Sequence, residues 1–181
     1  NANATVNELP SLTTTFGDAY YLTNDAQSFD VVITNKGTAY PNAELRLGIP
    51  AGVTLTISGT EYSLTGDIVD LGELTADEVV TLTFTATMST SGLKTMSFDV
   101  YDGATPDGLL LFSTVETAVV YTKPTISSSD LKGPYQVGKP QSFTLNINNV
   151  DTMYDPNTLT LHFGLPDGTK LKYDDQSEQT C

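Results

Sequence analysis

The chain contains a run in which apolar residues and threonines alternate strictly. Its apolar members are Val80, Leu82, Phe84, Ala86 and Met88, and its hydroxyl members are Thr81, Thr83, Thr85 and Thr87. Successive side chains of a β-strand point to opposite faces, whereas an α-helix would scatter the same residues around its circumference. The run therefore predicts a long strand with one apolar face. Threonine is the commonest residue of the chain, which favours strands elsewhere as well.

A second alternating run follows, in which Met96, Phe98 and Val100 are the apolar members. The segment 89–92 between the two runs consists of small residues that tolerate turns, so we predict a hairpin of two long paired strands. The segment 108–121 predicts a last strand, and Lys123 and Pro124 then begin a stiff linker. The sequence thus predicts an all-β protein.

An internal repeat divides the chain. The pattern Tyr21-x5-Gln27-Ser28-Phe29 recurs 114 residues later as Tyr135-x5-Gln141-Ser142-Phe143. The same shift carries Pro10-Ser11-Leu12 onto Pro124-Thr125-Ile126, and a shift of 116 carries the segment 48–52 onto 164–168. A unit of this length matches one immunoglobulin-like sandwich, which has roughly 100 residues in about seven strands.

The apolar stripes of the two copies also agree. Phe29, Val31 and Ile33 correspond to Phe143, Leu145 and Ile147, and Leu45, Leu47 and Ile49 correspond to Leu161, Phe163 and Leu165. Both copies are therefore expected to bury the same stripe. His162 takes the position of Arg46 on the polar face, so we interpret it as a solvent-facing strand residue.

We therefore predict tandem immunoglobulin-like β-sandwiches, the second one incomplete. Residues 1–9 are a leader or the tail of a preceding repeat, 10–123 are the first sandwich repeat, and 124–181 are the N-terminal half of a second repeat. Such a half leaves apolar faces and strand edges open. The chain is then either a window cut from a longer array or one that takes its missing strands from another molecule. The expected partners are neighbouring repeats or copies of the same protein, and a strand-swapped or Cys181-linked dimer is the second partner hypothesis.

Charge and composition exclude several classes of function. There are 22 acidic and 8 basic residues, for a net charge of −14, which argues against binding nucleic acid. No apolar run is long enough for a transmembrane segment. A single Cys and a single His give little support to disulfides or zinc sites. The acidic, Thr-rich and nearly Cys-free composition predicts an extracellular or cell-surface location.

Three motifs of the first unit resemble the DUF11 and CARDB-like group of immunoglobulin-like repeats of bacterial and archaeal surface proteins. They are the strand from Phe29 that ends in Asn35-Lys36-Gly37, the turn Pro50-Ala51-Gly52, and the turn Leu71-Gly72-Glu73-Leu74 before the long alternating strand. We attribute Asn35 and Gly37 to positive backbone angles that end the strand. The resemblance implies a spacer, stalk, lattice or adhesion role and no reaction.

One acidic group is a candidate metal site. Asp99, Asp102 and Asp107 lie where a strand passes into a loop, and their oxygens suit Ca²⁺. Their spacing matches no EF-hand, and Asp-Gly pairs are also ordinary turn formers, so both interpretations stay open. A second acidic set is Asp151, Asp155 and Asp167, for which the turn interpretation is the stronger.

Other chemistry finds little support in the sequence. There is no Trp, and the adjacent Tyr20 and Tyr21 should point to opposite faces of a strand, which argues against a flat sugar-binding platform. Acidic pairs such as Asp77-Glu78 look like solvated turns, so we predict no catalytic residues and no enzyme. We predict a non-catalytic structural or assembly module of a large exported cell-surface protein, such as an S-layer, stalk or adhesin repeat. The alternative is a calcium-dependent or carbohydrate-binding sandwich module of a secreted protein.

Overall fold

The computed structural model describes residues 8–18, 20–103, 107–129, 136–149, 160–164, 167–172 and 179–180. The chain divides into two compact units, Asn1–Asp151 and Thr152–Cys181. The described residues form strands, turns and bends, which confirms the all-β prediction. In this part of the chain no helix could cross a membrane. The expected leader lies almost wholly outside the described residues, as does Cys181.

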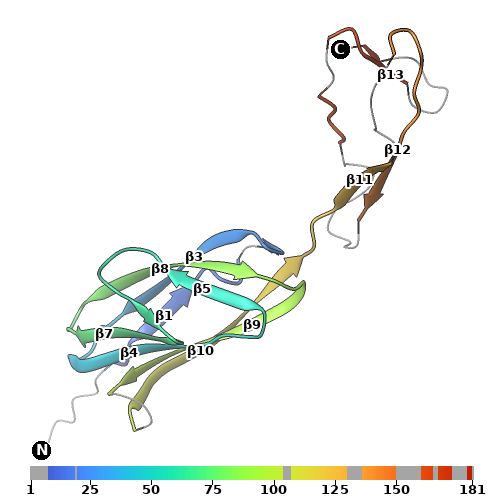
Figure 1. The fold of residues 1–181 in the computed structure, drawn as a ribbon. Coiled ribbons are helices and arrows are strands. Elements are labelled where there is room, and N and C mark those ends of the chain that lie inside the picture. The colour runs from blue at the N-terminus through green and yellow to red at the C-terminus, as the bar shows by residue number, and fades with distance from the viewer. Residues whose placement is uncertain are drawn as a thin grey trace, which may run out of the picture. The chain divides into compact units, whose positions relative to one another are not determined.

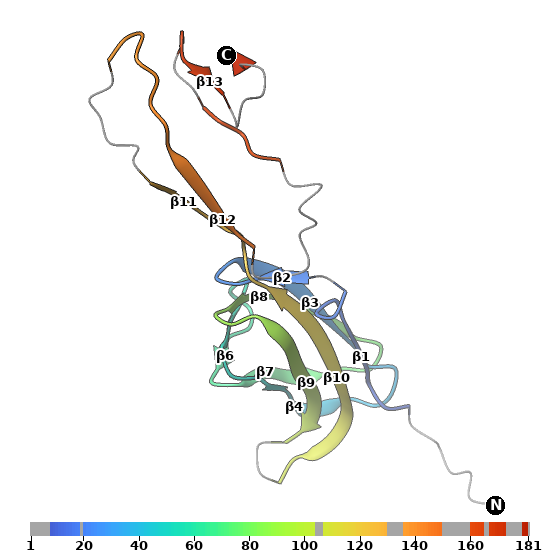
Figure 2. The same ribbon diagram turned by 90° about the vertical axis from the view of Figure 1, so that its right-hand side faces the viewer.

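Ten strands between Ser11 and Tyr121 build two sheets (Figure 1, and Figure 2 in a view turned by 90°). The first sheet has four antiparallel strands in the order β1 (Ser11–Thr14), β3 (Ala26–Thr34), β8 (Val79–Met88) and β5 (Val53–Ile57). The second has six, in the order β2 (Tyr20–Leu22), β10 (Leu109–Tyr121), β9 (Gly92–Asp102), β4 (Tyr40–Gly48), β7 (Ile68–Leu74) and β6 (Leu64–Thr65). The short β2 runs parallel to β10, and the other pairs of this sheet are antiparallel.

The core lies between the two sheets and is formed by the alternating residues that the sequence indicates. All five apolar members of the run on β8 are buried, as are the three on β9. The rings of Phe29 and Phe84 stack with centroids 5.5 Å apart, and Phe16 and Phe98 meet Phe29 edge-on. Burying such a side chain stabilises the fold by about 1.5–3 kcal/mol. The predicted strand periodicity is confirmed.

The predicted hairpin between the two alternating runs is wrong. β8 pairs with β3 and β5, whereas β9 pairs with β10 and β4, so the segment after Met88 crosses from one sheet to the other. Period-two alternation identifies the buried face of a strand, and it does not distinguish a neighbour in the same sheet from one in the facing sheet. Both strands bury their apolar faces in the same core, but β8 does so from the first sheet and β9 from the second.

Strands β11 (Thr125–Ser129) and β12 (Thr144–Asn148) form a separate antiparallel pair. Their register repeats that of β1 and β3 with the shift of 114, since Ile126 opposes Ile147 as Leu12 opposes Ile33. The preceding turn is repeated too. The amide of Lys139 donates to the carbonyl of Gln136, and the amide of Asp25 donates to the carbonyl of Leu22, each at a distance of 3.2 Å. The sequence repeat is therefore also a repeat of local structure.

Burial differs between the two copies, so the expectation that both bury the same stripe is wrong. Ile126 and Ile147 are 57% and 50% exposed, whereas Leu12 and Ile33 are 6% and 0% exposed. Phe143 is half-buried and precedes β12, whereas Phe29 lies buried within β3. A two-stranded sheet provides no facing sheet for such residues.

The segment that corresponds to β4 also differs from expectation. Leu161 and Phe163 are 37% and 40% exposed, and residues 160–164 form no strand. β4 takes its ladder hydrogen bonds from β7 and β9, and among the described residues no strand pairs with residues 160–164. His162 is exposed as predicted, but it does not lie in a strand. The last pair of strands is β13 (Lys170–Leu171) and β14 (Gln179–Thr180).

Candidate functional site

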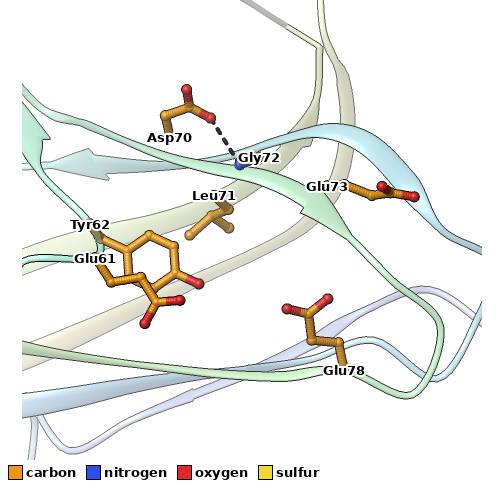
Figure 3. Close-up of a pocket in the computed structure, with 7 residues that line it drawn as sticks. All are labelled: Glu61, Tyr62, Asp70, Leu71, Gly72, Glu73 and Glu78. Atoms are coloured by element: carbon orange, nitrogen blue, oxygen red, sulfur yellow. Dashed lines mark hydrogen bonds between the residues drawn. The ribbon is translucent and has the colours of Figure 1, made fainter.

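A shallow acidic hollow lies beside β7 and the turn that leads to β8 (Figure 3). It has a volume of about 430 Å³, and the carboxylates of Glu61, Asp70, Glu73 and Glu78 line it together with Tyr62, Leu71 and Gly72. Glu61 and Glu78 lie on the same side of β7 as Leu71, and Asp70 lies on the other side. No basic side chain lines the hollow, so it is a focus of negative potential.

Two of these carboxylates are held by the local backbone. Glu78 accepts hydrogen bonds from the amide and the hydroxyl of Thr75, at 2.6 and 2.8 Å, and so closes the turn between β7 and β8. Asp70 accepts from the amide of Gly72 at 2.9 Å. The Thr-x-x-Glu spacing is the signal in the sequence from which the first of these contacts could have been expected.

Gly72 marks a β-bulge in β7, which corrects the turn predicted at 71–74. Ala43 opposes Gly72 and Glu44 opposes Asp70, so Leu71 is the extra residue on the bulged strand. Gly72 has a φ of +69°, which an L side chain adopts only with strain. The chain reverses its direction between β7 and β8, where Asp77 has a φ of +62°. The bulge leaves Leu71 without an opposing residue on β4.

The acidic surroundings act on the one phenol of the hollow. Burial, then the carboxylates of Glu61 and Glu78, raise the pKa of Tyr62, because each disfavours the phenolate. Among the described residues, however, no group of three or more His, Cys, Asp or Glu side chains is placed to hold a metal ion. The hollow therefore attracts cations through its charge and offers them no ligand set.

The structure does not gather the three aspartates predicted to bind calcium. Asp99 accepts hydrogen bonds from the hydroxyls of Ser97 and Ser113 on the outer face of the second sheet. Asp102 lies three residues after Asp99 on β9, and side chains an odd number of residues apart on a strand point to opposite faces. Its carboxylate accepts a hydrogen bond from the amide of Asn42 at 3.3 Å. Asp107 lies in a turn before β10. Calcium at these residues stays a prediction from the sequence. Of the second acidic set, Asp167 is exposed, and Asp151 and Asp155 lie outside the described residues.

Four tyrosines of the sandwich bear on a sugar-binding platform, and the structure shows the surroundings of each of them. Tyr20 is 56% exposed and Tyr21 is 1% exposed, as the prediction of opposite faces requires. The ring of Tyr101 is covered by the guanidinium of Arg46, 3.9 Å from the ring centroid, and Arg46 also pairs with Glu44. Tyr121 meets Tyr20 edge-on. These contacts suit packing on a strand face better than stacking on a flat ligand.

Asn35 is a buried structural residue, and the reason differs from the predicted one. Neither Asn35 nor Gly37 has a positive φ. The Asn35 side-chain amide instead donates to the carbonyls of Thr38, Leu74 and Thr75, and its oxygen accepts from the amide of Gly37. Gly37 is required because a Cβ there would clash with the carbonyl of Glu8. Asn35 thus ties the end of β3 to the end of β7.

Lys94 closes the opposite end of the sandwich. Its side chain points inward from β9 and is 9% exposed, yet its ammonium reaches the carbonyl of Ala51 and the hydroxyl of Thr90, at 3.3 and 2.7 Å. The aliphatic stem covers the core while the charged end stays at the rim. It joins the Pro50–Gly52 turn, where Gly52 has a φ of +80°, to the crossing between the sheets. Its role is structural.

The strand order defines the class of the first domain. The sheet β1-β3-β8-β5 corresponds to strands A, B, E and D of an immunoglobulin sandwich. In the other sheet β2 pairs in parallel with β10, and β10, β9 and β4 correspond to strands G, F and C. Residues 11–121 thus form an immunoglobulin-like β-sandwich. No family model matches the chain, and no curated protein matches it.

Several solved structures are similar to this chain. They include the CARDB domain of the PF1109 protein from Pyrococcus furiosus, in complex with di-metal ions, at 21% identity and a TM-score of 0.42, covering 66% of this chain and 100% of that domain. A protein that catalyses macrocyclization in alchivemycin A biosynthesis matches at 13% identity and a TM-score of 0.48, covering 72% of this chain and 93% of that one. BslA, a bacterial hydrophobin, matches at 13% identity and a TM-score of 0.43, covering 66% and 98%. The neighbours thus include a CARDB domain, and none of them indicates what this chain binds.

Proposed function

We propose that this chain is a load-bearing module of a large exported cell-surface protein, built from tandem immunoglobulin-like sandwiches and without catalytic activity. The observation that carries the proposal is the direction in which the chain enters and leaves the first sandwich. Ser11 pairs with Thr34 at the end of the sandwich where β8 begins, and Tyr121 lies at the end where β8 gives way to β9. Tension along the chain therefore runs along the strands.

The terminal strands are arranged to resist such tension. β2 and β10 lie side by side and parallel, with Tyr20 opposite Val119 and Leu22 opposite Tyr121, and the amide of Thr23 donates to the carbonyl of Tyr121 at 2.9 Å. Pulling on the two ends moves these strands in opposite directions along their axes. Their hydrogen bonds then share the load at the same moment, instead of opening one after another.

The repeated register supports the tandem arrangement. β11 and β12 reproduce the pairing of β1 and β3 residue by residue, and the turn at Gly168 has the same φ of +80° as the turn at Gly52. A second sandwich in series would extend the reach of the protein without a new fold. The net charge of −14 would keep neighbouring chains apart.

Single-molecule pulling tests the proposal. The full chain, with Cys181→Ser to remove the native thiol, is held through its two ends. We expect one high-force event that releases the segment between Ser11 and Tyr121, which is roughly 370–400 Å of extended chain.

A matched control changes only the direction of the load. The chain is held instead through Ser91→Cys and Thr122→Cys, because these positions flank the start of β9 and the end of β10, which lie together at one end of the antiparallel pair. This load opens the pair one rung at a time and should need several-fold less force. Equal forces in the two geometries would refute a load-bearing role.

Location and cation binding have their own tests. Antibodies against the folded sandwich should bind intact cells of the source organism, and labelling only after permeabilisation would contradict an exported protein. Calorimetric titration with Ca²⁺ should give no stoichiometric heat. A stoichiometric site that Asp102→Asn weakens would instead favour the calcium-dependent binding module.

A further inference from the structure

Among the described residues, a strand pairs with only one edge of β12, and the load-bearing role makes no use of the other edge. In the described part of the chain, β12 has one strand neighbour, β11. Its counterpart β3 has two, with β1 on one side and β8 on the other. Because β11 and β12 repeat the β1–β3 register, the open edge of β12 corresponds to the edge of β3 that β8 covers.

We propose that this edge binds an extended segment with the chemistry of β8, added as an antiparallel strand. The inference rests on the tandem arrangement proposed above. The β3–β8 register fixes the expected one, with Ile147, Leu145 and Phe143 opposite the residues that correspond to Val80, Leu82 and Phe84. Apolar residues would then alternate with threonines along the added strand.

Charge and exposure favour that occupant. The strand Thr144–Asn148 carries no charged residue, and neither does Val79–Met88, in a chain whose net charge is −14. An acidic segment would be repelled by the rest of the molecule, whereas an uncharged one is not. Ile147 is 50% exposed, so apolar surface beside the edge is available for burial. Edge strands of this kind readily accept another strand.

The full chain extended with a copy of β8 tests the proposal. A Gly/Ser linker after Cys181 places the added ten residues so that they begin 114 residues after Val79. The tether gives an effective concentration in the millimolar range, so weak affinity does not hide binding. We expect the amides of β12 to exchange with solvent at least about tenfold more slowly than in the unextended chain, measured by NMR.

The matched control carries the same ten residues with Val80, Leu82, Phe84 and Ala86 each exchanged with the threonine that follows it. This exchange moves the apolar face of the strand to the other side. The control should leave β12 unprotected. Equal protection by the control, no protection by the β8 copy, or concentration-dependent protection in the unextended chain through a second copy would each overturn the proposal.

The pulling experiment separates this inference from the proposed function. It loads the first sandwich, in which β12 takes no part. High force with no added strand would refute only the strand-binding edge. Low force with an added strand would refute only the load-bearing role.

Discussion

Replacing Asn35 with alanine removes a hydrogen-bonding side chain from a site with no solvent exposure. The side chain reaches the carbonyls of Thr38, Leu74 and Thr75 at 2.9, 3.1 and 2.8 Å, and accepts from the amide of Gly37 at 3.1 Å. A typical hydrogen bond contributes a net of about 1 kcal/mol, and buried groups left without a partner cost more. We therefore expect Asn35→Ala to lower the free energy of unfolding by about 3–4 kcal/mol.

Urea denaturation followed by far-UV circular dichroism measures this change, since the chain has no Trp. Lys36→Ala is the matched control, because Lys36 is the exposed neighbour and should change stability by less than about 0.5 kcal/mol. Asn35→Asp should be more destabilising at neutral pH, since a carboxylate cannot donate to three carbonyls and would be buried with its charge. A loss below about 1 kcal/mol for Asn35→Ala would refute the idea that this side chain joins β3 to β7.

Three further substitutions test the packing of the sandwich. The Tyr21 hydroxyl is buried with no hydrogen-bond partner in the described structure, so Tyr21→Phe should raise the free energy of unfolding by about 1 kcal/mol. Burial raises the pKa of Tyr21 to about 12, so the unfolded chain loses this proton near pH 10 while the folded chain keeps it. Stability should therefore fall by up to about 2–3 kcal/mol between pH 10 and 12, and Tyr21→Phe should remove that part of the fall in alkaline urea titrations. Gly72→Ala should cost about 1–2 kcal/mol in thermal unfolding through backbone strain alone, since an added Cβ meets nothing within 4 Å; no cost would argue against the bulge. Phe84→Ala should cost about 3–5 kcal/mol in urea, and a smaller loss would mean that the stack on Phe29 contributes little.

The sequence predicts the elements of this protein better than it predicts their partners. The alternation of apolar residues and threonines identifies β8 and its buried face, because the side-chain period of a strand is a local property. The shift of 114 residues anticipates the shared register of β1–β3 and β11–β12. The same local pattern fits either a hairpin or a crossing between sheets, so the pairing of β8 and β9 was predicted wrongly.

The acidic hollow and the role of Asn35 could not be predicted from local pattern. Glu61 and Glu78 line the same hollow because a bulge at Gly72 and a turn at Asp77 bring separate segments together. The sequence around either carboxylate gives no sign that the other lies nearby. From the sequence, Asn35 can be interpreted either as a residue of a turn that ends the strand or as a buried amide. Its hydrogen bonds to the carbonyls of Leu74 and Thr75, which are distant in sequence, show that it is a buried amide.

What the sequence by itself determined is therefore the all-β class, the buried stripes of β3, β4, β8 and β9, and the internal repeat. Tertiary structure decided which strands share a sheet, at which end of the sandwich the chain enters and leaves, and whether an apolar stripe is buried. The physical reason is that side-chain direction depends on the backbone at each residue, whereas burial depends on what lies opposite. Leu12 and Ile126 occupy equivalent places in the two copies, and the first is buried because a second sheet faces it.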